Sequence, residues 1–194
     1  GKTSLLRLLA GIYEPHEGSV QIDQTEVGHI HPEDLRRGVG VVLQTPMLFS
    51  GSVKENLLLG KPDATDEEII EAAKQAGIDE FIGQLPDGYE TVLTERGQQL
   101  SGGQRQAMCI ARSLISNPSV IILDEPTSAM DSGTEQQLMV RLKLLFEHKT
   151  VIIITHRGTL LSLVDRVIVI DSGRIVADGP KEEVLKTATT GTPS

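Results

Sequence analysis

Three short apolar runs constrain the fold of this chain more than any other feature. Val39–Leu43, Val120–Leu123 and Val151–Ile154 are rich in β-branched residues and do not alternate with polar residues. Parallel strands that are covered on both faces have this pattern, whereas a strand with one face in water alternates. The segments between the runs are long enough for helices, so we expect an α/β fold built on a parallel sheet.

Helical periodicity and capping signals occupy the intervening segments. We expect a helix from about Thr3 that ends at Gly11 and Pro15, a helix capped by Asp66 that ends at Gly77, a helix capped by Ser101 from about Gln104 to Ser116, and a helix from Ser132 to about Glu147. Ser52 and Glu55 have the spacing of a capping box. Val167–Ile170 and Arg174–Ala177 flank a turn and predict a hairpin.

These elements predict one domain over 1–186, with a helical subdomain over about 52–116 and a flexible tail over 187–194. The tail is expected because its Thr, Gly, Pro and Ser residues have little to bury. Because the chain starts with Gly1 rather than Met, we interpret it as a piece of a longer protein. Under that interpretation the first strands of the sheet lie upstream.

Polar side chains follow each of the three apolar runs. Gln44 follows the first run, Asp124 and Glu125 end the second, and Thr155 and His156 follow the third. Open α/β sheets bind ligands at the carboxyl ends of their strands. Any one of these endings could be a solvated strand end, but three together favour a shared pocket.

A phosphate-binding pattern stands at the start of the chain. Gly1, Lys2 and Thr3 match the last three positions of a P-loop, in which backbone N–H groups and Lys hold phosphates and Thr binds Mg²⁺. By themselves these residues could be a charged helix start. Asp124 and Glu125 supply what that reading lacks, one carboxylate for Mg²⁺ and a second for a water molecule, so nucleotide chemistry is favoured.

The most specific string is Leu100-Ser101-Gly102-Gly103-Gln104. We expect it by chance in roughly 10⁻³ to 10⁻⁴ of chains of this length. A glycine turn with a serine cap explains the residue types but not the whole string in this order. Because glycine has no side chain, a triphosphate can approach this helix N-terminus closely.

Together these motifs resemble the ATP-binding domain of an ABC transporter, over about Gly1 to Pro180. By this resemblance the fold has a P-loop NTPase-type parallel sheet core, and the helical subdomain carries the signature motif. The resemblance assigns these residues: Gly1, Lys2, Thr3 and Ser4 end the Walker A motif, Gln44 is the Q-loop glutamine, Leu100 to Gln104 are the signature, Asp124 and Glu125 end Walker B, Ser128 to Asp131 are the D-loop, and His156 is the switch histidine.

Two further stretches resemble exporters rather than importers. They are Pro46 to Asn56 and Thr94 to Gly97, the latter similar to the X-loop that faces the membrane domain. Within exporters the chain is similar to bacterial type I secretion and peptide-exporting half-transporters. This resemblance implies a motor for export at the cytoplasmic face of a membrane, the inner membrane in a bacterium.

The resemblance also implies a head-to-tail dimer that encloses ATP and Mg²⁺, with a transmembrane domain as a second partner. In it Thr3, Gln44 and Asp124 hold the metal, Glu125 is the general base, and His156 and Gln44 complete the catalytic set. The phosphate and nucleotide contacts come from these residues: Gly1, Lys2, Thr3, Ser4, Gln44, Ser101, Gly102, Gly103, Gln104, Asp124, Asp131 and His156. The residue that stacks on adenine in this family lies outside the chain.

Composition narrows the classes of function. The chain has 18 Lys and Arg against 27 Asp and Glu, a formal charge of −9, and few aromatic residues, so we expect no nucleic-acid partner. The longest apolar run, Ala107 to Ala111, is far too short to cross a bilayer. We expect the single cysteine, Cys109, to be a core residue and His16, His29, His31 and His148 to lie at the surface.

Two other readings remain open at this point. One is a soluble ABC-type ATPase of DNA repair or chromosome organisation. Such families insert coiled coils or zinc modules between the Walker motifs, and the sequence between Thr3 and Asp124 contains neither heptads nor more than one cysteine. The other reading is a truncated, non-catalytic fragment that only occupies a dimer partner.

Overall fold

The three apolar runs form one parallel sheet, as the sequence predicts. The computed structural model describes residues 2–190, and for residues 187–190 only the backbone. Strand β6 (Val120–Asp124) lies in the middle, between β3 (Val39–Val42) and β7 (Thr150–Ile154), and both pairings are parallel. Val39 pairs with Val120, and Val120 pairs with Thr150, so the strands are in register.

Both faces of the sheet are covered, which explains why the strands do not alternate with polar residues. Ile121 and Leu123 of β6 belong to the large core that includes the helices after β3. Ile122 belongs to a smaller core on the opposite face, where Leu6 of α1 (Lys2–Leu9) packs against it. Successive residues of a strand therefore enter two different cores.

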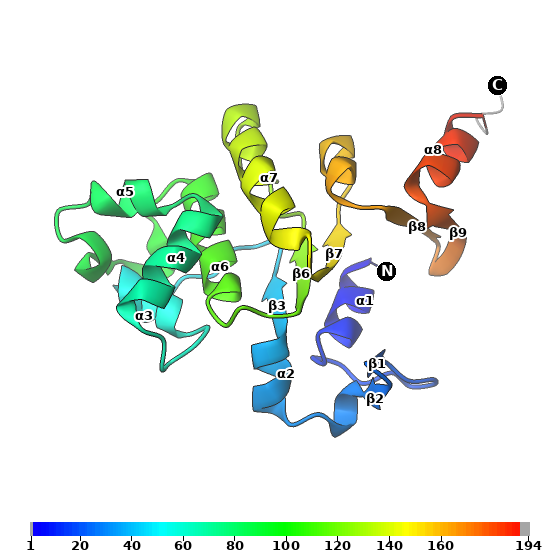
Figure 1. Cartoon of the computed structure of the whole chain (residues 1–194), viewed down its shortest axis with the longest axis horizontal. Coiled ribbons are helices and arrows are strands. Elements are labelled where there is room, and N and C mark those ends of the chain that lie inside the picture. The colour runs from blue at the N-terminus through cyan, green and yellow to red at the C-terminus, as the bar shows by residue number, and fades with distance from the viewer. Residues whose placement is uncertain (1, 191–194) are drawn as a thin grey trace.

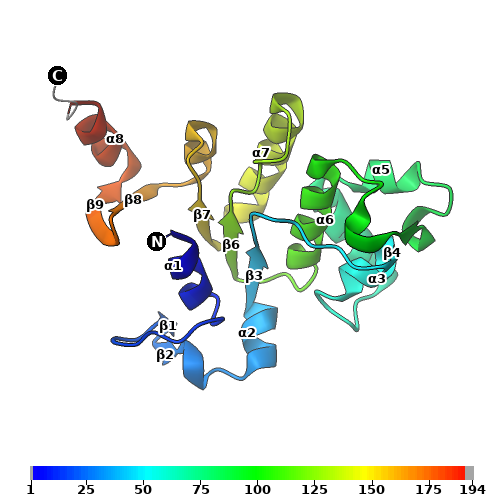
Figure 2. The ribbon, with the colours of Figure 1, turned by 180° about the vertical axis from the view of Figure 1, so that it is seen from behind.

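The helical part of the chain lies on one side of the sheet and the C-terminal hairpin on the other (Figures 1 and 2). The helical part contains these elements: α3 (Val53–Leu58), α4 (Asp66–Ala76), α5 (Asp79–Gly83) and α6 (Gly102–Leu114), with the short strands β4 (Gly51–Ser52) and β5 (Val92–Leu93) and the 3₁₀ turns η2 (Gly88–Glu90) and η3 (Glu95–Gly97). These elements share one core with the sheet. They lie within 51–114, close to the predicted subdomain, whose limits stay a prediction.

Capping boxes define where three of these helices start. Ser52 and Glu55 form the box that the sequence predicts, and Ser101, predicted only as a cap, forms a second box with Gln104. The predicted cap of α4 is wrong by one residue, because Thr65 and not Asp66 is the N-cap. The Thr65 hydroxyl accepts from the Glu68 N–H, and the Glu68 carboxylate accepts from the Thr65 N–H. This reciprocal pair satisfies two backbone donors, which a cap at Asp66 could not do with the same partner.

The segment before β3 contains elements that the sequence analysis did not predict. They are the two-residue strands β1 (Gln21–Ile22) and β2 (Thr25–Glu26), the 3₁₀ turn η1 (Val27–His29) and the helix α2 (Pro32–Gly38). Asp23 and Gln24 connect β1 and β2 with positive φ angles of 47° and 67°. Both residues adopt the left-handed conformation that a tight two-residue hairpin turn requires.

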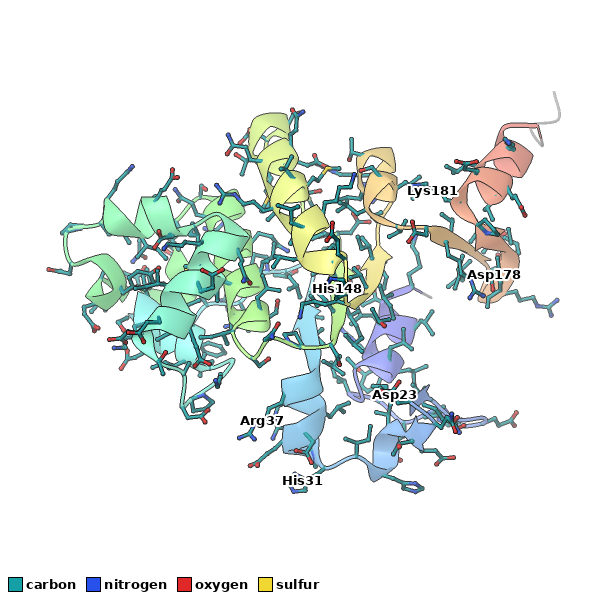
Figure 3. The ribbon with its side chains drawn as sticks, in the orientation of Figure 1. Asp23, His31, Arg37, His148, Asp178 and Lys181 are labelled. Carbon is teal, nitrogen blue, oxygen red and sulfur yellow. The ribbon has the colours of Figure 1, made fainter. Side chains whose placement is uncertain are left out.

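The predicted hairpin is present near the end of the described chain. Strand β8 (Arg166–Asp171) pairs antiparallel with β9 (Arg174–Pro180), and the Arg166 guanidinium donates two hydrogen bonds of 2.7 Å to Asp178. Figure 3 shows Asp178 and Lys181 on this hairpin and the following helix. Helix α8 (Lys181–Thr190) extends four residues into the predicted tail, and 191–194 lie outside the described residues.

Two helical segments follow the last two strands of the sheet on the C-terminal side of the chain. They are α7 (Ser132–Phe146), between β6 and β7, and the 3₁₀ segment η4 (Gly158–Leu163), after β7. Within residues 2–190 no helix combines the length and the apolar character needed to span a bilayer.

Candidate functional site

The polar residues that follow the three strands lie at one edge of the sheet, as predicted. Asp124 pairs with Ile154 in the β6–β7 register, and the Glu125 N–H donates to the Ile154 carbonyl at 2.8 Å. Glu125 and His156 therefore start from neighbouring strand ends. Gln44 is exposed and lies two residues after β3, the remaining strand of this sheet, at the carboxyl end of that strand.

The Glu125 carboxylate is fixed by the turn after β7. It is 6% exposed, and its Oε1 accepts from the His156 N–H at 3.0 Å, while the Thr155 hydroxyl donates to Oε2 at 3.1 Å. The His156 ring nitrogen Nδ1 lies 2.6 Å from Oε1. An N–H group at Nδ1 can donate to this carboxylate oxygen.

Glu125 also has an unusual backbone conformation. Its φ angle is +48°, in the left-handed region that a residue with a Cβ atom rarely adopts. Such a conformation costs about 1–3 kcal/mol and is concentrated at functional sites. The turn therefore holds the Glu125 carboxylate in place at a free-energy cost. The chemistry predicted from the sequence requires a second carboxylate at this position, directly after the aspartate that ends the strand.

The surroundings of the Asp124 carboxylate differ from those of the hydrogen-bonded Glu125 carboxylate. It is 3% exposed, and its carboxylate has no hydrogen-bond partner among residues 2–190. Burial raises the pKa of Asp124, the charge of Glu125 raises it further, and Lys2 and Arg7 of α1 oppose both effects. A buried carboxylate that receives no hydrogen bond is suited to bind a cation, and a lysine at the start of a helix beside it is suited to bind an anion.

The protein groups present fit Mg²⁺ only in part. Within the described residues no group of three or more His, Cys, Asp and Glu could hold a metal ion. Asp124 and the exposed Thr3 hydroxyl are hard oxygen donors, which Mg²⁺ prefers, and protein sites for Mg²⁺ commonly take further oxygens from phosphates and water. This donor set fits a magnesium ion that arrives with a phosphate.

The signature string forms the start of α6. Ser101 is its N-cap, and its hydroxyl accepts from the Gln104 N–H at 3.1 Å. A Cβ atom added to Gly102 would lie 3.1 Å from the Ala129 Cβ, so the first turn of α6 packs closely against the D-loop. Glycine permits this close approach because it has no side chain.

Asp131, predicted to contact nucleotide, caps α7 in this structure. Its Oδ1 accepts from the backbone N–H groups of Gly133 and Thr134 at 2.9 and 3.0 Å. The hydroxyl and N–H groups of Thr134 are the main reason that the pKa of Asp131 is below its usual value. Any contact of Asp131 with nucleotide stays a prediction.

The structure brings the predicted residues together in two groups. Lys2, Asp124, Glu125 and His156 meet at the sheet edge, whereas Ser101 to Gln104 lie on the helical side of the molecule (Figure 1). Within residues 2–190 no hydrogen bond or ion pair joins the two groups. Lys2, Thr3 and Ser4 are exposed in α1, and Gly1 lies outside the described residues.

Two residues beside the Q-loop were given no role of their own in the sequence analysis. The Arg112 guanidinium of α6 donates to the Met47 carbonyl at 3.0 Å. The Asn56 amide of α3 donates to the Phe49 carbonyl at 2.9 Å and accepts from the Phe49 N–H at 2.8 Å. They anchor the segment after Gln44 to two helices. Asn56 is 2% exposed, and a polar residue on the apolar face of a helix was the available signal.

The expectations for cysteine and histidine are confirmed. Cys109 is 5% exposed in the large core, and burial raises the pKa of its thiol. His16, His29, His31 and His148 are exposed. Figure 3 places His31 at the start of α2 and His148 beside the end of α7.

Comparison with known proteins agrees with the arrangement of these motifs. The family model of the ABC transporter matches residues 1–128. The chain belongs to the ABC transporter family. The uncharacterised ABC transporter ATP-binding protein YknU of Bacillus subtilis (strain 168) is 43% identical over 186 residues, which are 96% of this chain and 32% of that protein.

Two further ABC proteins bear on the subclass. A Staphylococcus aureus (strain NCTC 8325 / PS 47) protein named for multidrug export as an ATP-binding/permease protein is 42% identical over 95% of this chain and 32% of its own length. The solved structure of a bacterial Atm1-family ABC exporter with ATP bound matches with a TM-score of 0.90 and 36% identity. That match covers 100% of this chain and 35% of the exporter chain.

The resemblance to ABC exporters is thereby confirmed, as is the α/β fold. The narrower likeness to type I secretion half-transporters stays a prediction. This chain spans about a third of the length of the ABC proteins that it matches.

Proposed function

We propose that this chain is the ATP-hydrolysing motor domain of an ABC exporter. The observation that carries the proposal is the sheet edge, where Asp124, a buried carboxylate without a hydrogen-bond partner among residues 2–190, lies next to Glu125, a carboxylate held by a histidine. Lys2 at the start of α1 acts on the same edge. Phosphoryl transfer depends mainly on positioning and charge stabilisation, and these groups supply both.

Each residue at this edge has a role that its chemistry supports. Lys2 and the N-terminus of α1 bind the terminal phosphates of ATP. Thr3, Gln44 and Asp124 hold Mg²⁺, and Ser4 adds a hydroxyl in the first turn of α1. When bound, Mg²⁺ supplies positive charge beside the β- and γ-phosphates.

Glu125 is the proposed general base toward the attacking water. Its Oε1 is held by the backbone and ring of His156, so the carboxylate has a defined orientation. The imidazole of His156 is exposed and contacts Glu125 through Nδ1, which leaves Nε2 as the nitrogen that would donate to the γ-phosphate and help position the water. A base positioned in this way contributes about 10²–10⁴-fold to a reaction rate.

The signature completes the site from a second copy of the domain. Ser101 and the glycines after it are exposed or half-buried at a helix N-terminus, where a phosphate is favoured. They do not meet Lys2 within this chain, which supports a head-to-tail pair in which Ser101, Gly102, Gly103 and Gln104 close the partner's site. A transmembrane domain is the second proposed partner, and the proposed location is the cytoplasmic face of a membrane.

The proposal is tested in the full-length polypeptide that contains this chain. We expect Glu125→Gln to keep ATP binding and to lower ATP turnover about 10²–10⁴-fold, because the amide cannot accept a proton from water. Glu147→Gln, at the exposed end of α7, is the matched control and keeps normal turnover. Turnover by Glu125→Gln within about threefold of the unsubstituted protein would exclude Glu125 as the base.

The same assay separates the remaining readings. A truncated, non-catalytic fragment predicts no ATP turnover by residues 1–194 themselves, so the assay is repeated with that piece. A soluble ATPase of DNA repair or chromosome organisation predicts turnover that responds to DNA and not to a transported substrate, and the exporters among the relatives favour the motor instead.

A further inference from the structure

A second buried carboxylate lies behind the site, on the helix that follows the D-loop. Glu135, in the first turn of α7, is 6% exposed. Its Oε1 accepts from the hydroxyls of Thr127 at 3.1 Å and Thr159 at 2.7 Å. Its Oε2 accepts from the Arg157 guanidinium at 2.6 Å. Glu135 therefore joins three segments, namely α7, the turn after β6 and the turn after β7.

The carboxylate is ionised in these surroundings. Burial raises the pKa of Glu135, but the hydrogen bonds from Thr159 and Thr127 and the charge of Arg157 outweigh burial and hold the pKa below its usual value. Arg157 supplies the compensating charge, with its side chain 32% exposed. Removing one partner of such a pair leaves the other charge without compensation in a half-buried place.

The contacts of Glu135 continue directly to the proposed catalytic residues. The Arg157 N–H donates to the Thr155 hydroxyl at 3.0 Å, and that hydroxyl donates to Glu125 at 3.1 Å. His156 lies between Thr155 and Arg157 in the sequence, so contacts to Glu125 on one side and to Glu135 on the other fix its backbone.

Thr127 makes the corresponding link on the other strand end. It is two residues after Glu125, is fully buried, and donates to the same Glu135 oxygen as Thr159. A single carboxylate oxygen thus receives one hydroxyl from the turn after Glu125 and one from the start of η4, three residues after His156. That oxygen therefore adds a link between the two turns, beside the direct contacts of Glu125 with Ile154, Thr155 and His156.

We propose that Glu135 is a positioning residue for ATP hydrolysis, which holds the turns of Glu125 and His156 in register through Thr127, Thr159 and Arg157. The inference rests on the proposed function of the Glu125 site. Glu135 itself touches neither substrate nor metal in this scheme. A misplacement of about 1 Å at a reacting centre can cost about 10²-fold in rate, so this role has a measurable effect on turnover.

The test uses ATP turnover by the full-length polypeptide, with Mg-ATP affinity and thermal unfolding measured on the same samples. We expect Glu135→Gln and Arg157→Met each to lower kcat about 10- to 100-fold while KM and Mg-ATP affinity change less than about threefold. The double variant falls no further than the lower single variant, because both remove one linkage. Arg157→Lys keeps the charge and recovers part of the lost kcat.

Matched variants keep the inference falsifiable. Glu147→Gln makes the same chemical change at the exposed residue that follows the same helix, and it keeps normal kcat. If Glu135→Gln fails to fold, Thr159→Val, which removes one hydroxyl at an exposed position, takes its place, and we expect it to lower kcat about 3- to 10-fold.

The outcomes separate this inference from the proposed function. A normal kcat in Glu135→Gln or Thr159→Val, with only the unfolding temperature lowered, shows a purely structural role and overturns the inference. If Glu125→Gln is inactive at the same time, the proposed function survives. If the unsubstituted protein has no ATP turnover, or Glu125→Gln has normal turnover, both the proposed function and the inference are overturned.

Discussion

At the scale of single residues, Asp124 is buried beside Glu125 without a hydrogen-bond partner within residues 2–190. Burial and the Glu125 charge raise its pKa, so the folded state holds this proton more tightly than the unfolded chain does. Protonated Asp124 therefore stabilises the folded state at low pH. This stabilisation is lost as the pH rises from the pKa of the unfolded state through the raised pKa of the folded state. At pH 7 the ionised carboxylate destabilises the nucleotide-free protein.

We therefore expect Asp124→Asn to raise the unfolding temperature of the nucleotide-free protein at pH 7 and to weaken Mg²⁺-dependent ATP binding. The gain shrinks at acidic pH, where Asp124 is protonated. Asp131→Ala is the control of opposite sign, because the pKa of Asp131 is lowered by its cap contacts and their loss destabilises α7. Thermal unfolding across pH with and without Mg-ATP measures both. A lower unfolding temperature for Asp124→Asn at pH 7 would contradict the argument.

At the scale of elements, the N-termini of α1 and α6 are both suited to phosphate but lie in separate parts of the molecule (Figures 1 and 2). We expect Ser101→Arg to keep nucleotide binding and to block closure by a second copy, because it adds bulk and charge at the start of α6. In a linked dimer, Ser101→Arg in one copy and Lys2→Ala in the other leaves one complete site and measurable turnover. Both substitutions in one copy damage both sites and abolish turnover.

The control for this experiment is Ser19→Arg, which adds the same side chain at an exposed position before β1. We expect Ser19→Arg to leave the ATP turnover of the linked dimer unchanged, whichever copy carries it. Equal turnover for the two arrangements of Ser101→Arg and Lys2→Ala would contradict the proposal that Ser101 of one copy closes the site of the other copy.

At the scale of the whole molecule, β7 pairs only with β6 within the described residues, so its second edge carries no strand there. Apolar side chains nearby are exposed as well: Ile168, Val169, Ile175 and Val176 of the β8–β9 hairpin are between 37% and 63% exposed. Burying one aliphatic side chain contributes about 1.5–3 kcal/mol, and an open strand edge favours aggregation.

We therefore expect residues 1–194, expressed alone, to unfold at a lower temperature, to aggregate and to bind Mg-ATP poorly compared with a longer piece of the same polypeptide. Several uncovered side chains are enough to offset a large part of the 5–15 kcal/mol that stabilises an ordinary domain. Calorimetry, light scattering and ATP titration of the two proteins provide the comparison. Equal unfolding temperatures and ATP affinities would show that the edge of β7 needs no further strand.

What the sequence by itself determined was local. The apolar runs at 39–43, 120–123 and 151–154 predicted the strands, and the capping residues Ser52 and Ser101 predicted helix starts, because these signals depend on neighbours a few positions away. The order of the motifs was enough to predict the ABC family. Thr65 was missed although its signal was local, because Thr65 and Glu68 have the spacing of a capping box, whereas Asp66 has Ile69 three residues later.

Only the tertiary structure decided which carboxylates share a function. Glu135 has the sequence context of a solvent-facing residue in a helix, and its burial against Thr127, Arg157 and Thr159 depends on where two distant turns are placed. The positive φ of Glu125 and the packing of Gly102 against Ala129 depend on long-range contacts in the same way. Periodicity and capping cannot encode such contacts, because they arise only when segments far apart in the chain meet across the sheet edge.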